Sequence, residues 1–411
     1  MRVLYIDGDG PFGGASRSLF EAVRALPAGS VDAFFVAARG TALDFYRQVA
    51  TGVVTTRGMT KFDNTRYSRY RGVRWLILLR EVFHFPFTIA ALLQARGRWK
   101  HVDVIHVNEA VYIVPALIAK WIFGAPVVVH VRSLQHVDPR SLRGRWLNRR
   151  LARDAAAIVA INENTRATLP AELHVDVIQN SFTAKRAPQP DPDIISKLDR
   201  LRPTSLKVGF VGNLHFSKGL FELLEAAKLL KHSGHDIEFL IVGGVTMTDR
   251  GLKAWMLDKA GLAQNVEAEL ARRVTEEGLD DTFHLLGATL DIKCVYDRMD
   301  VLCFPSYYDA PGRPVFEAAF SSVPSIVCVD KPRSDTLVHG ETGLAIPARD
   351  VNALADAILH FARSRGEVQR MGGNALRLAE SNFDPATNAR KLLAVYSRVS
   401  SAVEHIVPAT R

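Results

Sequence analysis

Two carboxylates, Asp309 and Glu317, flank a Gly-Arg-Pro turn that directly follows a short apolar run. That run, 301–305, and a second one at 325–329 have the length of buried strands, and Pro314 between them suits the first position of a helix. In such a strand-helix-strand unit, ligands bind where loops leave the carboxyl ends of the strands and helices present their N-terminal amides. Carboxylates accept hydrogen bonds from hydroxyl groups, so the segment predicts a ligand site. For Glu317 the alternative is a favourable position near the positive end of the helix.

A lysine, Lys218, stands at the start of another predicted helix. It follows the apolar run 206–211 and a polar loop, and the helix begins at Leu220. A cation at this place opposes the helix dipole, unless it shares an anion with the helix amides. The position therefore predicts an anionic ligand, and a solvated loop lysine is the alternative.

A glycine-rich turn, 8–14, follows the first apolar run and precedes a predicted helix at 16–26. Its amides can approach a phosphate or a sugar closely. It also matches GxGxxG, the dinucleotide fingerprint, which requires an acidic residue at the end of the second strand. Arg39 stands there instead and could hold a 2′-phosphate, so an NAD(P)-dependent oxidoreductase stays open. A tight strand-to-helix turn without a ligand is the other alternative.

His130 ends the apolar run 127–129 and is followed closely by Arg132. An imidazole and a guanidinium should therefore emerge at the carboxyl edge of a sheet. Histidine can donate or accept a hydrogen bond near neutral pH, which suits a site. A structural histidine with satisfied hydrogen bonds is the alternative.

Apolar segments of strand length alternate with segments of helix length along the whole chain. The expected strands are 2–6, 32–37, 103–108, 126–131, 156–161, 175–179, 206–211, 237–242, 283–286, 300–304, 324–329 and 343–346. Such alternation is typical of α/β proteins in which helices cover both faces of parallel sheets. We therefore expect two doubly wound domains with a cleft between them.

The domain boundaries follow from a proline-rich stretch between 183 and 205, which has the composition of a linker. We expect a first domain at 1–182, a linker at 183–204 and a second domain at 205–384. The tail from Pro385 carries apolar residues at helical spacing. We expect it to form a crossover helix within 385–411 that packs on the first domain.

The composition is that of a folded protein of two domains. The chain has 411 residues, of which 48% are hydrophobic and 23% charged. Its three cysteines do not suggest a disulfide framework, and two lie inside apolar runs, so we expect a reducing cytosol. The first apolar run is too short for a signal peptide. The apolar stretches 75–93 and 112–123 carry charges and are expected to be buried or interfacial helices.

Basic residues are concentrated in the first half of the chain, which has a net charge of +9. One cluster is Lys61 with the arginines of Arg66–Arg74, and the other is Arg140–Arg153. An anionic partner, either a phospholipid surface or a polyanionic substrate, is one interpretation. A solvated face with internal salt bridges is the alternative. The basic runs lack a recognisable nucleic-acid-binding motif, so we expect no nucleic acid partner.

Taken in order, these segments resemble the retaining glycosyltransferases of family four, which have the GT-B fold. The resemblance covers nearly the whole chain. It is carried by Gly13-Gly14, His130, the turn 177–180, Gly212 with Lys218-Gly219, the spacing Asp309-x7-Glu317-Ala318 and the segment 339–344. It implies an α/β fold with two Rossmann-like domains facing a cleft, a nucleotide-diphosphate sugar held mainly by the C-terminal domain, and an acceptor against the N-terminal domain.

The resemblance also implies roles for single residues. Lys218 would bind the diphosphate, Asp309 would meet hydroxyls of the donor sugar, and Glu317 would accept from the ribose hydroxyls. His130 would lie near the donor sugar, so the implied catalytic residues are His130, Lys218 and Asp309. The other implied donor-binding residues are Gly13, Gly14, Gly212, Asn213, Gly312, Arg313, Pro314 and Val315. A lysine and helix amides can stabilise the charge that grows on a departing diphosphate.

The sequence departs from the family pattern at two positions. Asn213 stands where many members have an arginine, so one phosphate cation is missing, and Arg313 or Arg132 could substitute for it. Asp309 stands where the family has a glutamate, and its shorter side chain could admit a bulkier sugar or a bridging water. Both changes concern the choice of donor more than the reaction.

The expected function is transfer of a sugar from a nucleotide-diphosphate sugar, with retention, to a lipid-linked or glycan acceptor in cell-surface polysaccharide or glycoconjugate synthesis. No cofactor and no metal are expected, because the sequence shows no DxD-type site. The expected location is the cytoplasm, peripheral on the inner face of the membrane. A non-catalytic GT-B protein that binds a nucleotide is a further alternative to the oxidoreductase.

Overall fold

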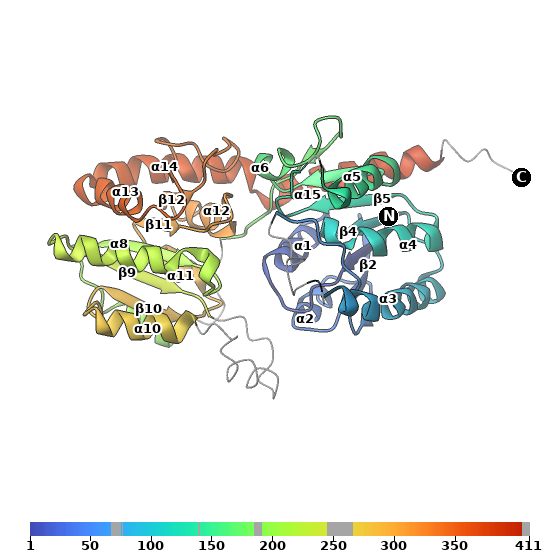
Figure 1. Ribbon diagram of the computed structural model, residues 1–411. Helices are drawn as coiled ribbons and strands as arrows, with labels where there is room; N and C mark the ends of the chain where they lie inside the picture. The colour runs from blue at the N-terminus through green and yellow to red at the C-terminus, as the bar shows by residue number, and fades with distance from the viewer. Residues whose placement is uncertain (67–74, 76, 139, 185–190, 245–265, 405–411) are drawn as a thin grey trace, which may run out of the picture. The chain divides into compact units, whose positions relative to one another are not determined.

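The computed structural model describes residues 1–66, 75, 77–138, 140–184, 191–244 and 266–404. It divides into two compact units (Figure 1). The first contains Met1–Phe182 together with Phe383–Arg411, and the second contains Thr183–Asn382. Each unit is an α/β sandwich around a parallel sheet, which confirms the expected fold class.

The first unit has a seven-stranded parallel sheet in the order β3-β2-β1-β4-β5-β6-β7. The strands are β1 (Arg2–Asp7), β2 (Asp32–Ala38), β3 (Gly52–Thr56), β4 (Val104–Val107), β5 (Val127–Val131), β6 (Ala157–Ala160) and β7 (Asp176–Val177). Most strand residues are buried on both faces, as parallel sheets require. The sequence analysis missed β3, whose five residues form only a short apolar run.

Helices cover both faces of this sheet. One face packs against α1 (Gly14–Arg24), α2 (Ala42–Tyr46) and α15 (Pro385–Glu404). The other packs against α3 (Ile77–Trp99), α4 (Ile113–Phe123) and α5 (Leu142–Asp154). The short helices η2 (Ala110–Tyr112) and α6 (Glu163–Arg166) follow β4 and β6.

The final helix, α15, belongs to the first unit although it follows the second unit in sequence. Leu392, Val395 and Val399 are buried in the core beside the β1 side chains. The hydroxyl group of Tyr396 lies 2.7 Å from Nδ1 of His106 on β4, and both side chains are fully buried. The last helix therefore completes one face of the first sheet.

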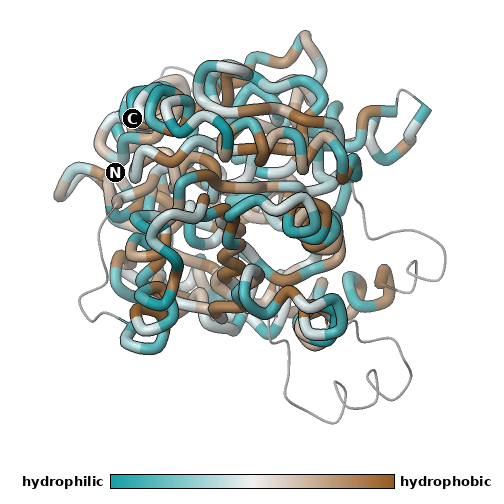
Figure 2. Tube along the Cα trace, turned by 90° about the vertical axis from the view of Figure 1, so that its left-hand side faces the viewer, coloured by the Kyte–Doolittle hydropathy of each residue, from teal (hydrophilic) through white to brown (hydrophobic). Residues whose placement is uncertain are grey.

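The second unit has a six-stranded parallel sheet in the order β10-β9-β8-β11-β12-β13. The strands are β8 (Leu206–Val211), β9 (Ile237–Val242), β10 (Phe283–Gly287), β11 (Val301–Phe304), β12 (Ser325–Cys328) and β13 (Gly343–Ile346). One face packs against α8 (Leu220–His232), α10 (Val266–Glu276), α13 (Val351–Arg363) and α14 (Arg365–Asn382). The other packs against α7 (Pro192–Leu198), α11 (Ile292–Tyr296) and α12 (Arg313–Ala319). Hydrophilic and hydrophobic residues alternate along the helical turns in Figure 2, as expected for helices with one face against a sheet.

The range 183–204, which the proline content predicts to be a linker, contains the helix α7. Ile194 and Leu198 of this helix are buried in the core of the second unit. Asp191 caps the helix through a hydrogen bond to the Ile194 amide, and Pro192 occupies its first position. The proline that favours a linker interpretation therefore also starts a helix.

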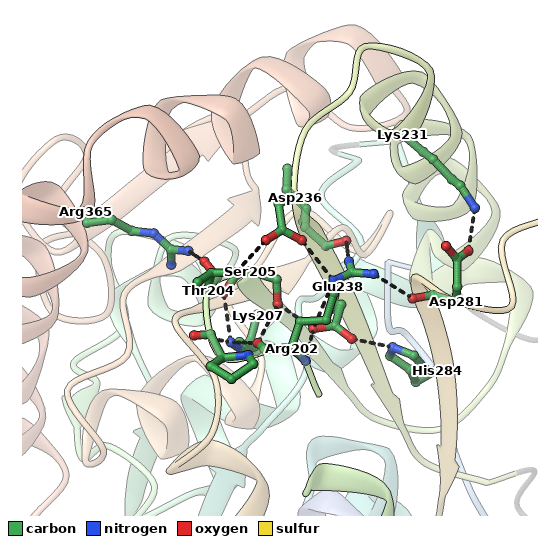
Figure 3. A network of polar contacts seen from close by, with 12 residues as sticks. Arg202, Thr204, Ser205, Lys207, Lys231, Asp236, Glu238, Asp281, His284 and Arg365 are labelled. Atoms are coloured by element: carbon green, nitrogen blue, oxygen red, sulfur yellow. Dashed lines mark hydrogen bonds and ion pairs between the residues drawn. The ribbon is translucent and has the colours of Figure 1, made fainter. Parts of the chain in front are cut away.

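Charged side chains are paired at the amino end of the second sheet (Figure 3). Glu238, buried on β9, accepts hydrogen bonds from the Arg202 amide at 2.9 Å and from the Ser205 hydroxyl group. Its other oxygen lies 3.1 Å from Nε2 of His284 on β10. The Arg202 guanidinium in turn pairs with Asp236 at 2.9 Å. A buried carboxylate such as Glu238 needs partners of this kind to offset the loss of hydration. Because these partners lie before β8 and on β10, the network connects the amino ends of β8, β9 and β10.

Candidate active site

Lys218 lies at the carboxyl edge of the second sheet. It ends the short helix η3 (Phe216–Lys218), and α8 begins two residues later. Gly219 between them has φ +71°, and a Cβ atom there would lie 2.1 Å from the carbonyl oxygen of Pro305. Only glycine permits this approach, which brings the loop after β8 against the loop after β11.

Two aromatic rings surround the Lys218 ammonium group. Its Nζ atom lies 5.3 Å from the ring centre of Phe304 and 5.1 Å from that of Tyr308, within the range of cation–π contacts. Burial lowers the pKa of Lys218 from its ordinary value. Within the described part of the chain, no carboxylate forms an ion pair with Lys218. A half-buried cation without a counter-ion is a ready partner for an anionic ligand.

Ser217 connects the loop that carries Lys218 to the loop that carries Asp309. Its carbonyl oxygen accepts a hydrogen bond from the Tyr307 amide at 3.0 Å. Its hydroxyl group donates to the Tyr308 hydroxyl group at 2.8 Å. These bonds hold Tyr308 beside Lys218, so the two predicted site segments are positioned by each other.

Asp309 follows Tyr308 and has a left-handed backbone with φ +49°. Aspartate tolerates this conformation better than most residues do. Its Oδ1 atom accepts a hydrogen bond from the Asp330 amide at 2.8 Å, which ties the loop after β11 to the loop after β12. The predicted sugar-binding carboxylate is therefore oriented by the next strand of the sheet.

Glu317 is buried on α12, and protein groups hold both of its oxygen atoms. Nε and Nη2 of Arg313 lie 3.0 and 2.9 Å from Oε1, and the Tyr296 hydroxyl group donates to Oε2 at 3.0 Å. Arg313, one candidate for the missing phosphate cation, is thus engaged by Glu317. Each carboxylate oxygen can accept more than one hydrogen bond, so Glu317 keeps acceptor capacity for a ligand.

The remaining predicted residues of the second unit surround these loops. Gly312 caps α12, and a Cβ atom there would lie 2.4 Å from the Phe304 ring. Pro314 and Val315 form the first turn of α12, where Val315 is buried. Gly212 has φ +156°, and its carbonyl oxygen would meet a Cβ atom at Gly243. Asn213 is exposed to solvent.

In the first unit, the glycine-rich turn is explained by close packing. A Cβ atom at Gly10 would lie 2.3 Å from the carbonyl oxygen of Arg39, and one at Gly8 would lie 2.4 Å from the Tyr112 ring. Gly13 caps α1, which begins at Gly14, and its amide donates to the Ser16 hydroxyl group at 2.9 Å. The close approach of the Tyr112 ring and the Arg39 backbone is therefore sufficient to explain the glycines at positions 8 and 10, and a bound dinucleotide is not needed for it.

His130 is buried at the end of β5. The Nδ1 atom lies 3.3 Å from Nη2 of Arg132. A guanidinium can only donate, so Nδ1 accepts and the proton is assigned to Nε2. Burial, and then the charge of Arg132, lower the pKa of His130 well below its ordinary value, so the imidazole is neutral. Arg132 also donates to Asn108 and Asn180, each at 2.7 Å, so this second candidate for the phosphate cation has protein partners as well.

The sequence analysis missed a polar pocket at the carboxyl edge of the first sheet. The pocket has a volume of about 230 Å³, and its polar lining consists of Asp9, Lys61, Asp63, Thr65, Arg80, Glu81, Glu109 and Ser133. The Lys61 ammonium group pairs with Asp9 at 2.6 Å, and Arg80 pairs with Glu81. Glu109 accepts from the Ser133 hydroxyl group at 2.8 Å and from two backbone amides. A glutamate directly after a predicted strand was the signal that could have identified this site.

Burial raises the pKa of two carboxyl groups at this edge. The pKa of Glu109 rises to about 7, although its hydrogen bonds oppose the shift. The pKa of Asp7 at the end of β1 rises to about 6, because burial is reinforced by the charge of Asp9. Carboxyl groups that titrate near neutral pH beside a pocket are typical of functional sites.

The two predicted basic clusters differ in how much the structure describes. Arg69, Arg71 and Arg74 of the first cluster lie outside the described residues. In the second, Arg150 and Arg153 lie 3.3 and 3.5 Å from Asp154, so part of its charge is neutralised. Arg140, Arg145 and Arg149 are exposed. Among the residues that the structure describes, there is no group of three or more acidic, histidine or cysteine side chains placed to hold a metal ion.

Two family models match the chain, one to each unit. A model described as "Glycosyl transferase 4-like domain" matches residues 13–180. A model described as "Glycosyl transferases group 1" matches residues 193–377.

Two curated relatives have names that describe glycosyl transfer. The chain is 24% identical to a glycogen synthase of Mycobacterium tuberculosis over 310 residues, covering 72% of this chain and 68% of that protein. It is 28% identical to the lipopolysaccharide core biosynthesis mannosyltransferase LpsB of Rhizobium meliloti over 250 residues, covering 60% and 66%. These names do not favour an oxidoreductase or a non-catalytic nucleotide-binding protein.

A solved structure shares the fold over the full length. The Anabaena protein Alr3699/HepE in complex with UDP-glucose superposes with a TM-score of 0.72 at 20% identity, covering 97% of this chain and 100% of that one. At this identity the likeness concerns the fold, which is that of two Rossmann-like units.

Proposed function

Because the chain belongs to the group 1 glycosyl transferases and is a glycosyltransferase of GT-B fold, we propose that it moves a sugar from a nucleotide-diphosphate sugar to a lipid-linked or glycan acceptor, with retention at the anomeric carbon. The observation that carries the proposal is Lys218, a half-buried cation that no described carboxylate neutralises. HepE was solved with UDP-glucose, which supports a uridine nucleotide as the first donor to test.

In the proposed reaction, the bond between the anomeric carbon and the diphosphate oxygen breaks, and a bond to an acceptor oxygen forms on the same face. The diphosphate leaves with the electron pair, and the proton of the acceptor hydroxyl group passes to a phosphate oxygen of the leaving diphosphate. Negative charge therefore grows on the departing phosphate. Lys218 stabilises that charge from a half-buried position beside two aromatic rings, where an electrostatic contact is stronger than in bulk solvent.

The other donor contacts follow from the resemblance together with the geometry. Glu317 accepts from the ribose hydroxyl groups, with its orientation held by Arg313 and Tyr296. Asp309 meets hydroxyl groups of the donor sugar. The resemblance alone assigns His130 to the donor sugar and Gly13 with Gly14 to the phosphates.

No metal or other cofactor is part of the proposal, because Lys218 can supply the electrostatic stabilisation that a cation would give. The test is full activity in excess chelator. A loss of activity that added magnesium restores would refute this part of the proposal.

The acceptor is proposed to be an anionic lipid carrier or a growing surface glycan. The name of the relative LpsB refers to lipopolysaccharide core synthesis, which supports a cell-surface product. The exposed arginines of Arg140–Arg153 could attract an anionic headgroup. We also propose a cytoplasmic location on the inner membrane face, since Cys294, Cys303 and Cys328 are all buried free thiols, as in a reducing compartment.

The decisive experiment is a thermal-shift screen of the protein against UDP-, GDP- and ADP-sugars. A ligand that binds only the folded state raises the melting temperature, so the true donor should stand out. The selected donor is then incubated with the protein and membrane lipid extract, and release of the free nucleoside diphosphate is measured. If no nucleotide sugar shifts the melting temperature and none is consumed, the proposed function is wrong.

A further inference from the structure

The outward face of α3 in the first unit is apolar over most of its length. The exposed fractions of Leu79, Val82 and Phe83 are 68%, 70% and 65%, and that of Leu93 is 53%. Pro86, Ala90 and Gly97 are exposed as well. Single exposed apolar side chains are ordinary, but a row of exposed apolar side chains along one helix marks an interaction surface.

These residues form one stripe, because their spacing is helical. Positions 79, 82, 83, 86, 90, 93 and 97 recur every three or four residues and so share a face. The opposite face carries Ala91, Leu92 and Ala95, which are buried in the core of the first unit. A helix that is apolar on both faces needs a cover on each, and the sheet supplies only one.

The inner face fixes α3 to its own unit, which argues against a helix that crosses a membrane. The Thr60 amide donates to the Thr88 hydroxyl group at 3.0 Å, and the Lys61 amide donates to the Glu81 carboxylate at 2.7 Å. Among the described helices, α3 is the one long and apolar enough to span a bilayer. Spanning would break these bonds and expose the core, so a helix lying flat against a surface is the arrangement that keeps them.

The charges around the stripe select an anionic surface. Glu81 is the only acidic residue of α3, and it is buried and paired with Arg80. At the end of the helix, Arg96, Arg98 and Lys100 are exposed. The exposed face therefore combines apolar and basic side chains without an acidic one, which is the composition of helices that lie in the headgroup region of anionic bilayers.

We propose that the stripe of α3 docks the protein on an anionic lipid bilayer, with the helix axis in the plane of the membrane. Val82, Phe83 and Leu79 enter the boundary between headgroups and acyl chains, and Arg96 and Arg98 contact lipid phosphates. This membrane contact is made by α3 and is separate from the arginine clusters described above. It rests on the proposed function only in that a lipid-linked acceptor would be found at such a surface.

The test is sedimentation of the full chain with vesicles of equal parts phosphatidylglycerol and phosphatidylcholine. Wild-type protein should sediment with them, and the double variant Val82→Gln/Phe83→Gln should bind about tenfold or more weakly, since two large apolar side chains no longer leave water. The double variant Arg96→Gln/Arg98→Gln should lose about tenfold of the preference for these vesicles over pure phosphatidylcholine.

The matched control is Leu290→Gln, which removes a side chain that is 90% exposed in the second unit and should leave sedimentation unchanged. All replaced side chains are exposed, so melting temperatures should match the wild type. Equal sedimentation of wild type and Val82→Gln/Phe83→Gln would overturn the proposal. So would light scattering that shows a wild-type dimer which this variant abolishes, because a second copy would then cover the stripe. Vesicle binding is measured without a donor, so its outcome is separate from that of the nucleotide-sugar screen.

Discussion

The two sheets have similar topology, but the cations at their carboxyl edges differ in whether a carboxylate pairs with them. The first edge presents Asp7, Asp9 and Glu109, and burial raises the pKa of Asp7 and Glu109. The second edge presents Lys218, which pairs with no described carboxylate. An anion would therefore find a cation without a carboxylate partner at the second edge, whereas Lys61 and Arg80 at the first edge are already paired with Asp9 and Glu81. The difference teaches that two sheets of similar topology can differ in whether the loops at their carboxyl ends leave a cation available to an anion.

Removing the cation of the second edge is expected to have the largest effect, and it tests whether the two edges differ in function. Lys218→Ala should lower turnover by roughly 10²–10³-fold, because the charge on the departing diphosphate loses its stabilising group. Steady-state release of nucleoside diphosphate is the measurement. Lys231→Ala is the matched control, since Lys231 pairs with Asp281 far from this edge and should leave turnover unchanged (Figure 3). Near-normal turnover of Lys218→Ala would remove the assigned role.

The burial of Glu109 at the first edge can be tested through the pH dependence of stability, because the pKa of this side chain is raised. In the folded protein its pKa is about 7, above the ordinary value, so the protonated form favours folding. The stability it contributes is complete below the ordinary pKa and is lost as pH rises through about 7. The difference in unfolding free energy between wild type and Glu109→Gln should therefore fall by up to about 3 kcal/mol between about pH 5 and pH 8. Urea denaturation at both pH values is the measurement.

The control for this experiment is Glu276→Gln, an exposed glutamate on α10, whose difference from wild type should not follow the same trend. A constant difference between wild type and Glu109→Gln at both pH values would mean that Glu109 is not the titrating group.

Glu317 tests whether the second edge binds the whole nucleotide or only its phosphates. Glu317→Gln should raise the dissociation constant of free UDP by about 10- to 100-fold, because hydrogen bonds to a charged acceptor are worth about 1.5–3 kcal/mol. Isothermal titration calorimetry is the measurement. Arg313→Met is the control, since it breaks the ion pair but keeps the carboxylate, so it should lower the melting temperature more than the affinity. UDP binding of Glu317→Gln at wild-type strength would contradict the ribose assignment.

The smallest expected effect concerns Asp309. Asp309→Glu should shift the preference among donor sugars by less than about tenfold, and it should cost about 1 kcal/mol of stability, since glutamate fits a φ of +49° less well. Competition between two nucleotide sugars measures the preference. An unchanged preference would show that the shorter side chain does not encode donor choice.

The alternation of apolar runs was sufficient to predict the fold class, because buried parallel strands are nearly continuous apolar segments. The strand β3 was missed, since Gly52–Thr56 is short and contains two threonines. The exposed face of α3 was foreseen in part. Its composition predicts a buried or interfacial helix, and only the packing shows which face is left exposed.

The candidate site was predicted in part. Lys218, Asp309 and Glu317 follow from their positions beside strand ends and helix starts. Their surroundings could not be predicted, because Phe304, Tyr308 and Tyr296 reach them through contacts between separate loops and helices. The same holds for Glu109, whose raised pKa depends on burial that no local pattern reveals.

The place of α15 in the first unit has a consequence for synthesis on the ribosome. The second unit is one continuous stretch, 183–382, so it can fold as soon as that stretch has emerged. The first unit lacks one of the helices that cover one face of its sheet until residues 385–404 are made, and Tyr396 must then find His106, 290 positions earlier in the chain. Throughout elongation the nascent first unit exposes the apolar surface that Leu392, Val395 and Val399 later cover. The protein thus depends on its last helix to end a period in which chaperones, or aggregation, compete for that surface.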